Sequence, residues 1–572
     1  MIRKFLAFSM SLTLILSGCG QGIVSTPPGN GNSNTTPPTP PPTPTTASAA
    51  IKHVVVIFGE NESFDHYFGT YPNAANTPGD PVFTAAAGTP TPNNYISNPS
   101  LLSQNPNLAS NGAANATNGA SASNPFRLAR SQAWTASQNH NYGPEQSAFN
   151  GGKMDSFPKF VGTANSSAQN AATGTVSTSP ATTTALTMGY YDGNTVTALW
   201  NYAQHYAMND HSFGTVFGPS TNGAINVVSG QTNGVDPANS VNPGSAVVSD
   251  GSATGLTDIG DADPTGDICS STTQSIRMTG KNIGDLLNTA GITWGWFQGG
   301  FDLTVTNPNG TTGCNRSTVS AYTGTQADNS PHHQPFQYYA STANFNHTRP
   351  TSPTTVGTAS DPAHHQYDIH DFTDALAAGN LPAVSYLKAA RYQDAHASNS
   401  DPLDEQTFIV NIVNAIEKSS FWSSTAIIIA YDDSDGWYDH VYNPVNGSAT
   451  SADTLNGAGV CISATAAAAA WPGVDPATLH AQGRCGYGPR LPFLVISPWA
   501  KKNFLDTTVT DQASVVRFIE DVFLSSQRIG GGSADTFAGS IMNMFDFSNG
   551  AAPPNPNVVQ LNPTTGLVTS GN

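Results

Sequence analysis

The sequence contains few charged residues, and basic ones are the scarcer kind. Asp, Glu, Lys and Arg make up 10% of its 572 residues, against roughly 25% in an average soluble domain. The 20 Lys and Arg residues face 38 Asp and Glu residues, so the formal net charge is −18. Binding a nucleic-acid backbone requires a basic patch, so we do not expect nucleic acid as a partner. An anionic substrate remains compatible, because a bound metal ion can outweigh the global charge locally.

The N-terminus lacks an apolar run long enough to span a membrane. Its run from Phe5 to Leu16 is too short for that and follows the basic pair Arg3 and Lys4. The run ends in L-S-G-C at Cys19, which resembles a bacterial lipoprotein processing site. We therefore expect residues 1–18 to be a signal peptide and Cys19 to carry lipid. The protein would be exported and anchored by this lipid at the cell envelope or in the periplasm. The alternative is an ordinary secretory signal with an incidental cysteine.

Cysteine is also rare, with five residues in the chain. Without Cys19 four remain, and an even number in an exported protein suggests disulfides. Pairing of neighbours gives Cys269–Cys314 and Cys461–Cys485, one of the three pairings that four cysteines allow. A structural zinc site is the alternative, but the sequence has no C-x-x-C spacing to support it.

The composition divides the chain into four parts. Residues 19–50 are rich in Pro, Thr, Gly and Ser, with "TTPPTPPPTPTT" at the centre, and predict a tether of extended polyproline character. Apolar patterning begins at Ile51, and we expect one large domain over residues 51–545. A polar C-terminal tail is expected over residues 546–572.

Within residues 51–545, buried strands alternate with helices. Continuous apolar, β-branched runs predict buried strands, and apolar residues that recur every three to four positions predict helices. The expected strands are 51–58, 292–297, 383–389, 423–433 and 490–498, and the expected helices are 195–206, 281–291, 404–419 and 511–523. Such alternation favours a layered α/β fold with a mainly parallel central sheet. The connections 73–130, 161–185, 230–275, 300–380 and 443–485 are too long for ordinary loops and are interpreted as insertions that decorate the sheet.

Acidic and amide side chains follow two of the predicted strands. Glu60 and Asn61 come directly after the first strand, and Asp432 and Asp433 come directly after "AIIIAY". Ligands of open α/β sheets bind beyond the carboxyl ends of the strands, and carboxylate and amide oxygens suit a hard divalent cation. Two adjacent carboxylates also repel each other unless a cation or a proton intervenes. The alternative interpretations are a helix cap after Asn61 and a solvated acidic turn after Asp433.

Ser220 is the candidate nucleophile. It lies in F-G-P-S-T-N-G-A, in which Gly218 and Pro219 predict a tight turn and Gly223 permits close approach of another backbone. A serine hydroxyl needs a base or a metal for activation. The sequence has no G-x-S-x-G elbow, so we favour activation by the metal.

Four histidines complete the candidate site, because imidazole can bind phosphate or transfer a proton to a leaving oxygen. Each lies among polar residues next to an apolar run, and each alone could equally be a hydrogen-bonded surface histidine. They are His140, His332, His333 and His396.

Taken together, these segments resemble the bacterial phosphoesterase family of phospholipases C and acid phosphatases. The resemblance covers about residues 51–525 in order, through "IKHVVVIFGENESFDHYFGTYP", "FGPSTNGAINVVSGQT", "HHQPFQYY", "YQDAHASNSDPLDEQ" and "YDDSDGWYDH". It implies an alkaline-phosphatase-like α/β fold. It further implies one divalent metal ion (Ca, Mg, Mn, Fe or Zn) on Glu60, Asn61, Ser220, Asp432 and Asp433. His333 or His396 would transfer protons, and His140 and His332 would bind the phosphate.

Within that family the sequence resembles the acid phosphatase branch. Asn222-Gly223-Ala224 stands where phospholipase members usually carry P-N-R, and "YDDSDGWYDH" fits the same branch. The expected activity is hydrolysis of phosphate monoesters through a phosphoserine. The alternatives are a phospholipase C acting on phosphatidylcholine-type lipids and a non-catalytic surface lipoprotein.

Overall fold

The computed structural model describes residues 46–164, 182–249, 254–443, 486–556 and 558–570. The expected signal peptide, Cys19 and the pair Cys461–Cys485 lie outside these residues. Of the expected tether, only 46–50 is described, and it contains the short helix α1 (Ala47–Ala50). None of the helices within the described ranges combines the length and apolar character that crossing a bilayer requires.

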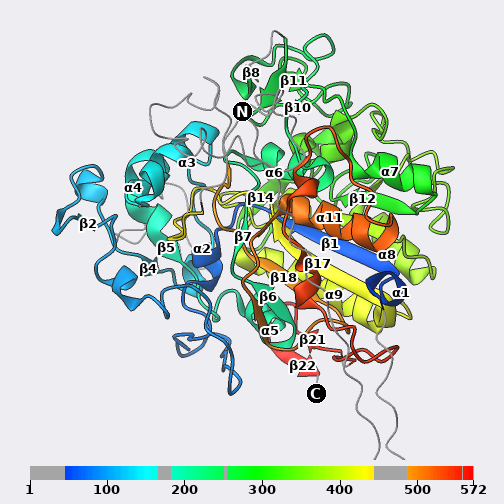
Figure 1. Cartoon of the computed structure of the whole chain (residues 1–572). Helices are drawn as coiled ribbons and strands as arrows, with labels where there is room; N and C mark the ends of the chain where they lie inside the picture. Colours follow the sequence, from blue (N-terminus) through cyan, green and yellow to red (C-terminus); the bar gives the residue numbers. More distant parts are fainter. Residues whose placement is uncertain (1–45, 165–181, 250–253, 444–485, 557, 571–572) are drawn as a thin grey trace, which may run out of the picture. The chain divides into compact units, whose positions relative to one another are not determined.

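A central sheet organises the described residues (Figure 1). Its eight strands lie in the order β15 (Gln366–Asp368), β12 (Trp294–Gln298), β16 (Val384–Lys388), β1 (His53–Gly59), β17 (Thr425–Tyr431), β18 (Phe493–Ile496), β6 (Ala207–Asn209) and β19 (Phe504–Asp506). All run in one direction except β18, which is antiparallel to both of its neighbours. The predicted α/β class with a mainly parallel sheet is therefore confirmed.

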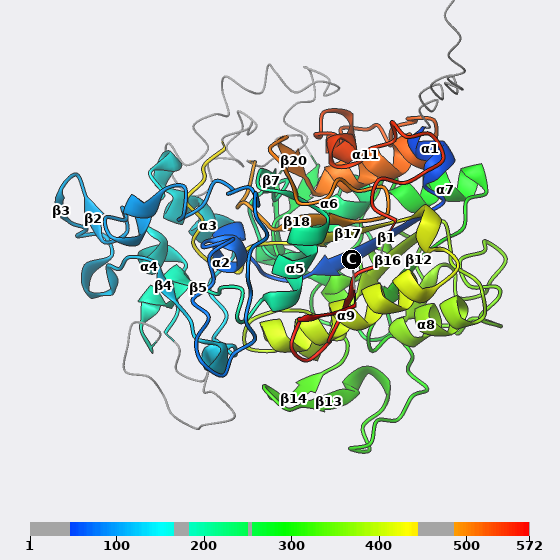
Figure 2. The same ribbon diagram turned by 90° about the horizontal axis from the view of Figure 1, so that it is seen from below.

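Helices cover both faces of this sheet. Viewed along the sheet, α1 and α11 lie on one side and α8 and α9 on the other (Figure 2). Helices α6 and α7 continue the layer of α11, and α5 packs against α9. Their bounds are α5 (Thr197–His205), α6 (Ser220–Ser229), α7 (Ile283–Ala290), α8 (Ile369–Ala377), α9 (Pro402–Lys418) and α11 (Gln512–Phe523).

The helix ends follow local capping chemistry. Asp401 accepts hydrogen bonds from the backbone N–H groups of Leu403 and Asp404, which fixes the start of α9. Asp511 accepts one from Ser514 and begins α11 in the same way. The four helices predicted from periodicity are confirmed within two residues at each end. Helix α6 was not predicted, because its Gly, Asn and β-branched residues have low helix propensity and its stability comes from packing.

The centre of the sheet is fully buried. Every residue of β16 and β17 is buried, and Val54, Val55 and Val56 of β1 have no exposed surface. In the register of the sheet, Gly59 of β1 lies opposite Tyr431 of β17, and Ile57 lies opposite Leu387 of β16. Three parallel strands thus end side by side, and the residues that follow them meet at one edge.

The insertions and other segments outside the central sheet form small structures around this core. Their elements are α2 (Phe64–Phe68), α3 (Tyr142–Phe149), α4 (Phe157–Phe160), β2–β3 (Ala109–Ser110, Ala113–Ala114), β4–β5 (Phe126–Arg127, Gly189–Tyr190), β7–β20 (Ser212–Phe213, Thr510–Asp511), β8–β9 (Val247–Ser249, Leu256–Asp258), β10–β11 (Asp263–Pro264, Ser275–Ile276) and β13–β14 (Ser317–Ser320, Gly324–Ala327). The interpretation of 300–380 as decoration alone was wrong, because β15 and α8 belong to the central sheet and its covering layer. A three-residue strand is too short to show a pattern.

The predicted disulfide Cys269–Cys314 is present, with its Cα atoms 5.3 Å apart. It ties the segment after β10 to the segment before β13. The expected polar C-terminal tail, residues 546–572, contains secondary structure. Strand β21 (Gln560–Leu561) pairs with β22 (Val568–Ser570) and packs against α9, and Val559 and Leu561 are buried in the main core.

Candidate active site

The hydroxyl of Ser220 lies among oxygen atoms from two strand ends. Ser220 is the first residue of α6, and its Oγ is 3.0 Å from Glu60 Oε2, 3.0 Å from Asp433 Oδ2 and 3.3 Å from Asn61 Oδ1. Glu60 and Asn61 follow β1, and Asp433 follows β17. Ser220 therefore contacts Glu60, 160 positions earlier in the chain, and Asp433, 213 positions later.

The orientation of the Asn61 amide is fixed by a neighbouring carboxylate. Its Nδ2 donates to Asp435 Oδ1 at 3.0 Å, so its Oδ1 turns toward Ser220. The Ser220 hydroxyl has one proton and can donate to only one of its three oxygen neighbours at a time. Four oxygens converge on one proton in a buried place, and this arrangement is unfavourable without a further positive charge.

A divalent cation fits this donor set. Carboxylate, amide and hydroxyl oxygens are the ligands that hard cations prefer. Burial raises the pKa values of Glu60 and Asp433 well above their usual range, and the neighbouring charge of Asp432 adds to both shifts. Asp432 itself holds the structure around the site, because its Oδ1 accepts from the backbone N–H groups of Asn61 at 3.0 Å and Asp433 at 2.7 Å.

Lys388 is a residue of the site that the sequence analysis did not select. It is the last residue of β16 and is completely buried, with Nζ 2.5 Å from Glu60 Oε1 and 3.4 Å from Asp432 Oδ2. It also donates to Gly59 O at 3.2 Å. Burial would lower the pKa of Lys388, but the carboxylates of Asp432 and Glu60 outweigh that effect and raise it. The lysine is therefore a permanent cation beside the carboxylates. A basic residue at the end of a buried strand was the signal that could have found it.

His333 and His332 approach the site from the Glu60 side. His333 is buried, and its Nδ1 is 3.1 Å from Glu60 Oε1 and 3.8 Å from Asp394 Oδ2. Its pKa lies well below the usual value because of burial and the positive charges of His332 and Lys388. His332 is more exposed, and its Nδ1 is 3.5 Å from Asp263 Oδ1. Its ring meets that of His333 edge-on at 4.5 Å.

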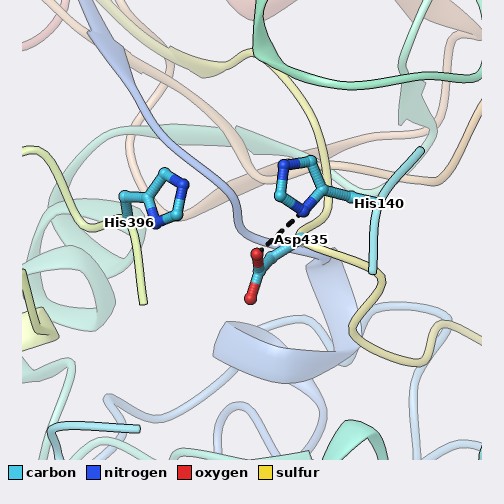
Figure 3. Close-up of side chains that lie close together, drawn as sticks. All are labelled: His140, His396 and Asp435. Carbon is cyan, nitrogen blue, oxygen red and sulfur yellow. Dashed lines mark ion pairs between the residues drawn. The ribbon is translucent and has the colours of Figure 1, made fainter. Parts of the chain in front are cut away.

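His140 and His396 form a second pair on the Asn61 side (Figure 3). Their ring centres are 5.9 Å apart, and His140 Nδ1 is 3.1 Å from Asp435 Oδ1. Burial alone would lower the pKa of His140, but Asp433 and Asp435 raise it well above its usual value. Burial lowers the pKa of His396, whose Nδ1 lies 2.6 Å from the carbonyl oxygen of Ala397. The pKa values of these two neighbouring imidazoles are thus shifted in opposite directions.

Asp439 and His440, the last two residues of "YDDSDGWYDH", do not join the oxygen cluster around Ser220 but form a separate ion-pair network. The carboxylate of Asp439 contacts Arg490, and His440 Nδ1 is 2.5 Å from Asp65 Oδ2. Arg490 also contacts Asp65, and it is completely buried. This network joins α2 to the loop after β17, and this loop also carries Asp433 and Asp435.

Comparison with known proteins places this geometry in a family. The profile of the Phosphoesterase family matches residues 51–524, which include the five oxygen-bearing residues, Lys388 and the four histidines. The chain belongs to the Phosphoesterase family.

Among similar proteins, the phosphoesterase chain matches several named as phospholipases. It is 28% identical over 195 residues to non-hemolytic phospholipase C of Pseudomonas aeruginosa, which is 34% of this chain and 27% of that protein. It is 25% identical over 187 residues to phospholipase C A of Mycobacterium tuberculosis, 32% and 33% of the two chains. It is 29% identical over 148 residues to non-specific phospholipase C6 of Arabidopsis thaliana, 24% of each. The matched segments span about a quarter to a third of these relatives.

In this phosphoesterase, Ser220 reaches the ends of the strands because of one glycine. A Cβ atom on Gly223 would lie 2.1 Å from the carbonyl oxygen of Asp432, so only glycine lets the first turn of α6 approach the aspartate pair. Gln512, at the start of α11, donates to Asp432 O at 2.7 Å and accepts from the backbone N–H of Thr215. It joins the strand end to the segment that leads into α6.

Glu145 of α3 joins the same two segments from the other side. It accepts from the backbone N–H of Gly218 at 3.0 Å and from Ser434 Oγ at 2.9 Å. Burial raises its pKa to about 7. The turn before Ser220 and the loop after Asp433 are therefore bonded to one carboxyl group, which the sequence analysis did not identify because Glu145 lies in an unremarkable polar segment.

Gly223→Ala is expected to separate Ser220 from Asp433, because the added methyl group must displace α6 from the Asp432 backbone. A displacement near 1 Å costs about 10²-fold in rate, and we expect phosphoester hydrolysis to fall by about that factor while thermal unfolding stays cooperative. Ser229→Ala is the control, because the hydrogen bonds of its Oγ go to the backbone of Ile225 and Gln231 at the far end of α6. Equal rates in the two variants would contradict the role of Gly223.

Lys388→Met is expected to destabilise the metal-free protein, because it leaves Glu60 and Asp432 without their cation. Loss of one partner of a buried pair costs about 3–5 kcal/mol. We expect this loss in denaturant unfolding with chelator and a clearly smaller loss with saturating Mn²⁺. Lys418→Met, at an exposed position in the last turn of α9, controls for the change in net charge. If Lys388→Met were equally destabilised with and without metal, a bound cation would not help to neutralise the carboxylates that Lys388 contacts.

Proposed function

We propose that the chain is an exported, metal-dependent phosphomonoesterase, an acid phosphatase that acts through a phosphoserine. The observation that carries the proposal is the contact of Ser220 Oγ with Glu60, Asn61 and Asp433 at 3.0–3.3 Å. A bound divalent ion on these residues and Asp432 would lower the pKa of the serine hydroxyl and neutralise charge on the phosphoryl oxygens. Its identity among Ca, Mg, Mn, Fe and Zn stays open.

In the proposed reaction, Ser220 Oγ passes its proton to Asp433 Oδ2, 3.0 Å away, and forms a bond to phosphorus, while the bond from phosphorus to the substrate alcohol breaks. Asp433 returns that proton to Ser220 Oγ when the phosphoserine is hydrolysed. His140 from one side and His332 from the other bind the phosphoryl oxygens. His396 gives a proton to the departing alcohol. Water then attacks the phosphoserine, His396 takes a proton from it, and inorganic phosphate and the free serine result.

His396 suits proton transfer better than His333. Its Nδ1 is within hydrogen-bond distance of the carbonyl oxygen of Ala397, which leaves Nε2 as the nitrogen that gains and loses the proton. It is only partly buried, whereas His333 is buried against Glu60. The structure thus supports His396 as acid and base and His333 as a support for Glu60.

The first turn of α6 favours a phosphatase. Asn222, at the place of the phospholipase-type triplet, donates through Nδ2 to the carbonyl oxygen of Asp258 at 3.0 Å and to its Oδ2 at 2.9 Å. Its side chain holds the 230–275 insertion against the site and is not presented to a substrate. The second candidate is a phospholipase C, and the names of the relatives favour it.

Export and lipid anchoring belong to the proposal as well. The disulfide Cys269–Cys314 supports an oxidising compartment such as the periplasm. In this proposal the thiol of Cys19 carries the lipid, and residues 19–50 connect it to the catalytic domain.

Ser220→Ala is expected to lower turnover of p-nitrophenyl phosphate by about 10³-fold or more, because no other hydroxyl replaces the nucleophile. Phosphatidylcholine vesicles assayed in parallel separate the two candidate activities. Faster release of phosphate from monoesters supports the phosphatase, and faster release of phosphocholine supports the phospholipase C. A Ser220→Ala protein that keeps near-normal turnover excludes the serine as nucleophile.

The turnover number is expected to fall as pH rises, because His396 must be protonated to act and burial lowers the pKa of its imidazole. His140 stays cationic over the same range because its pKa is raised, so KM should change little. Rates between about pH 4 and 8 should therefore show an acid optimum in kcat. His396→Asn should lower kcat by about 10²–10⁴-fold and remove that dependence. An unchanged pH profile in the variant would assign the proton transfer to another group.

A further inference from the structure

A cavity of about 400 Å³ lies between the start of α3 and the 230–275 insertion. Its walls include Asn141, Tyr142, Ser245, Asp261 and Gln274. It is separate from the oxygen cluster around Ser220, and the mechanism above gives it no role.

The cavity adjoins the nucleophile through two covalent neighbours of site residues. Asn141 follows the phosphate-binding His140, and Asp261 Oδ1 accepts a hydrogen bond at 3.0 Å from the backbone N–H of Thr221, which follows Ser220. Two positions further along the insertion, Asp263 faces His332. A phosphate ester with its phosphorus beside Ser220 therefore has this cavity next to it.

The walls combine polar residues with the apolar side chains of Ala246, Ile259 and Ala262, and they carry one sign of charge. Among the described residues that line the cavity, Asp261 is the only one with a charged side chain, and the other polar ones offer amide or hydroxyl groups. The charge of Asp261 reaches into the site, since it contributes to the raised pKa of His140. A carboxylate in this position repels a second anionic group on a substrate, while the amides and hydroxyls can bond to alcohol groups.

We propose that this cavity binds the alcohol part of the substrate and that Asp261 selects against alcohols that carry their own negative charge. The substrate class is then the phosphate monoesters of neutral or cationic hydroxylated alcohols. This inference rests on the proposed phosphatase function and names the substrates of the same site.

Two substrates that differ by one charge test the selection. Glycerol 3-phosphate has a neutral leaving alcohol, and the leaving alcohol of 3-phosphoglycerate carries a carboxylate. In Asp261→Asn the amide oxygen can still accept from Thr221, so α6 is expected to stay in position. We expect kcat/KM for 3-phosphoglycerate to rise about tenfold in this variant at constant ionic strength, and kcat/KM for glycerol 3-phosphate to change less than about twofold. Asp374→Asn, with its side chain 62% exposed on α8, is the matched control for net charge.

An equal change for both substrates, or none, would overturn the role of Asp261. A second variant, Ser245→Trp, narrows the cavity from its exposed rim and should lower kcat/KM for glycerol 3-phosphate but not for methyl phosphate. Equal effects on these two esters would place the alcohol elsewhere. Wild-type protein that hydrolyses none of the esters, p-nitrophenyl phosphate included, would instead refute the phosphatase function on which the inference rests.

Discussion

The site depends on the balance of charge among three buried carboxylates. Glu60, Asp432 and Asp433 are each at most 2% exposed, and such carboxylates cannot all stay ionised together without positive charge nearby. Lys388 supplies one positive charge from within the fold. One divalent ion bound beside Ser220 would supply two more, which balances the charge of these three carboxylates.

The fold brings these groups together by simple means. Strands β1, β16 and β17 are parallel neighbours, so Glu60, Lys388 and Asp432 leave the sheet at the same edge. Ser220 lies on a separate helix, α6, and Gly223 permits the close contact between that helix and the strand end. Glu145 and Gln512 then bond the segment before Ser220 to the loop after β17. The precision of the site comes from backbone contacts around it as much as from its own side chains.

Much of this arrangement could be predicted from the sequence, because buried strands and the polar residues at their ends leave clear local patterns. Glu60, Asn61, Asp432 and Asp433 follow long apolar runs, and Ser220 was selected through its turn and the family resemblance. Lys388 and Glu145 were missed, because their importance arises from contacts with residues distant in the chain. Strand β15 and helix α6 were missed because a three-residue strand has no periodicity and a Gly- and Asn-rich helix is stabilised by its packing.

The central claim is that one divalent cation, together with Lys388, neutralises the carboxylates beside Ser220. Anomalous diffraction from crystals of the protein loaded with Mn²⁺ tests it most directly. The account predicts a single strong peak within coordination distance of Ser220 Oγ, Glu60, Asn61, Asp432 and Asp433, with Lys388 still in contact with Glu60. A map without a peak there, or one with two metal ions and a displaced Lys388, would contradict it.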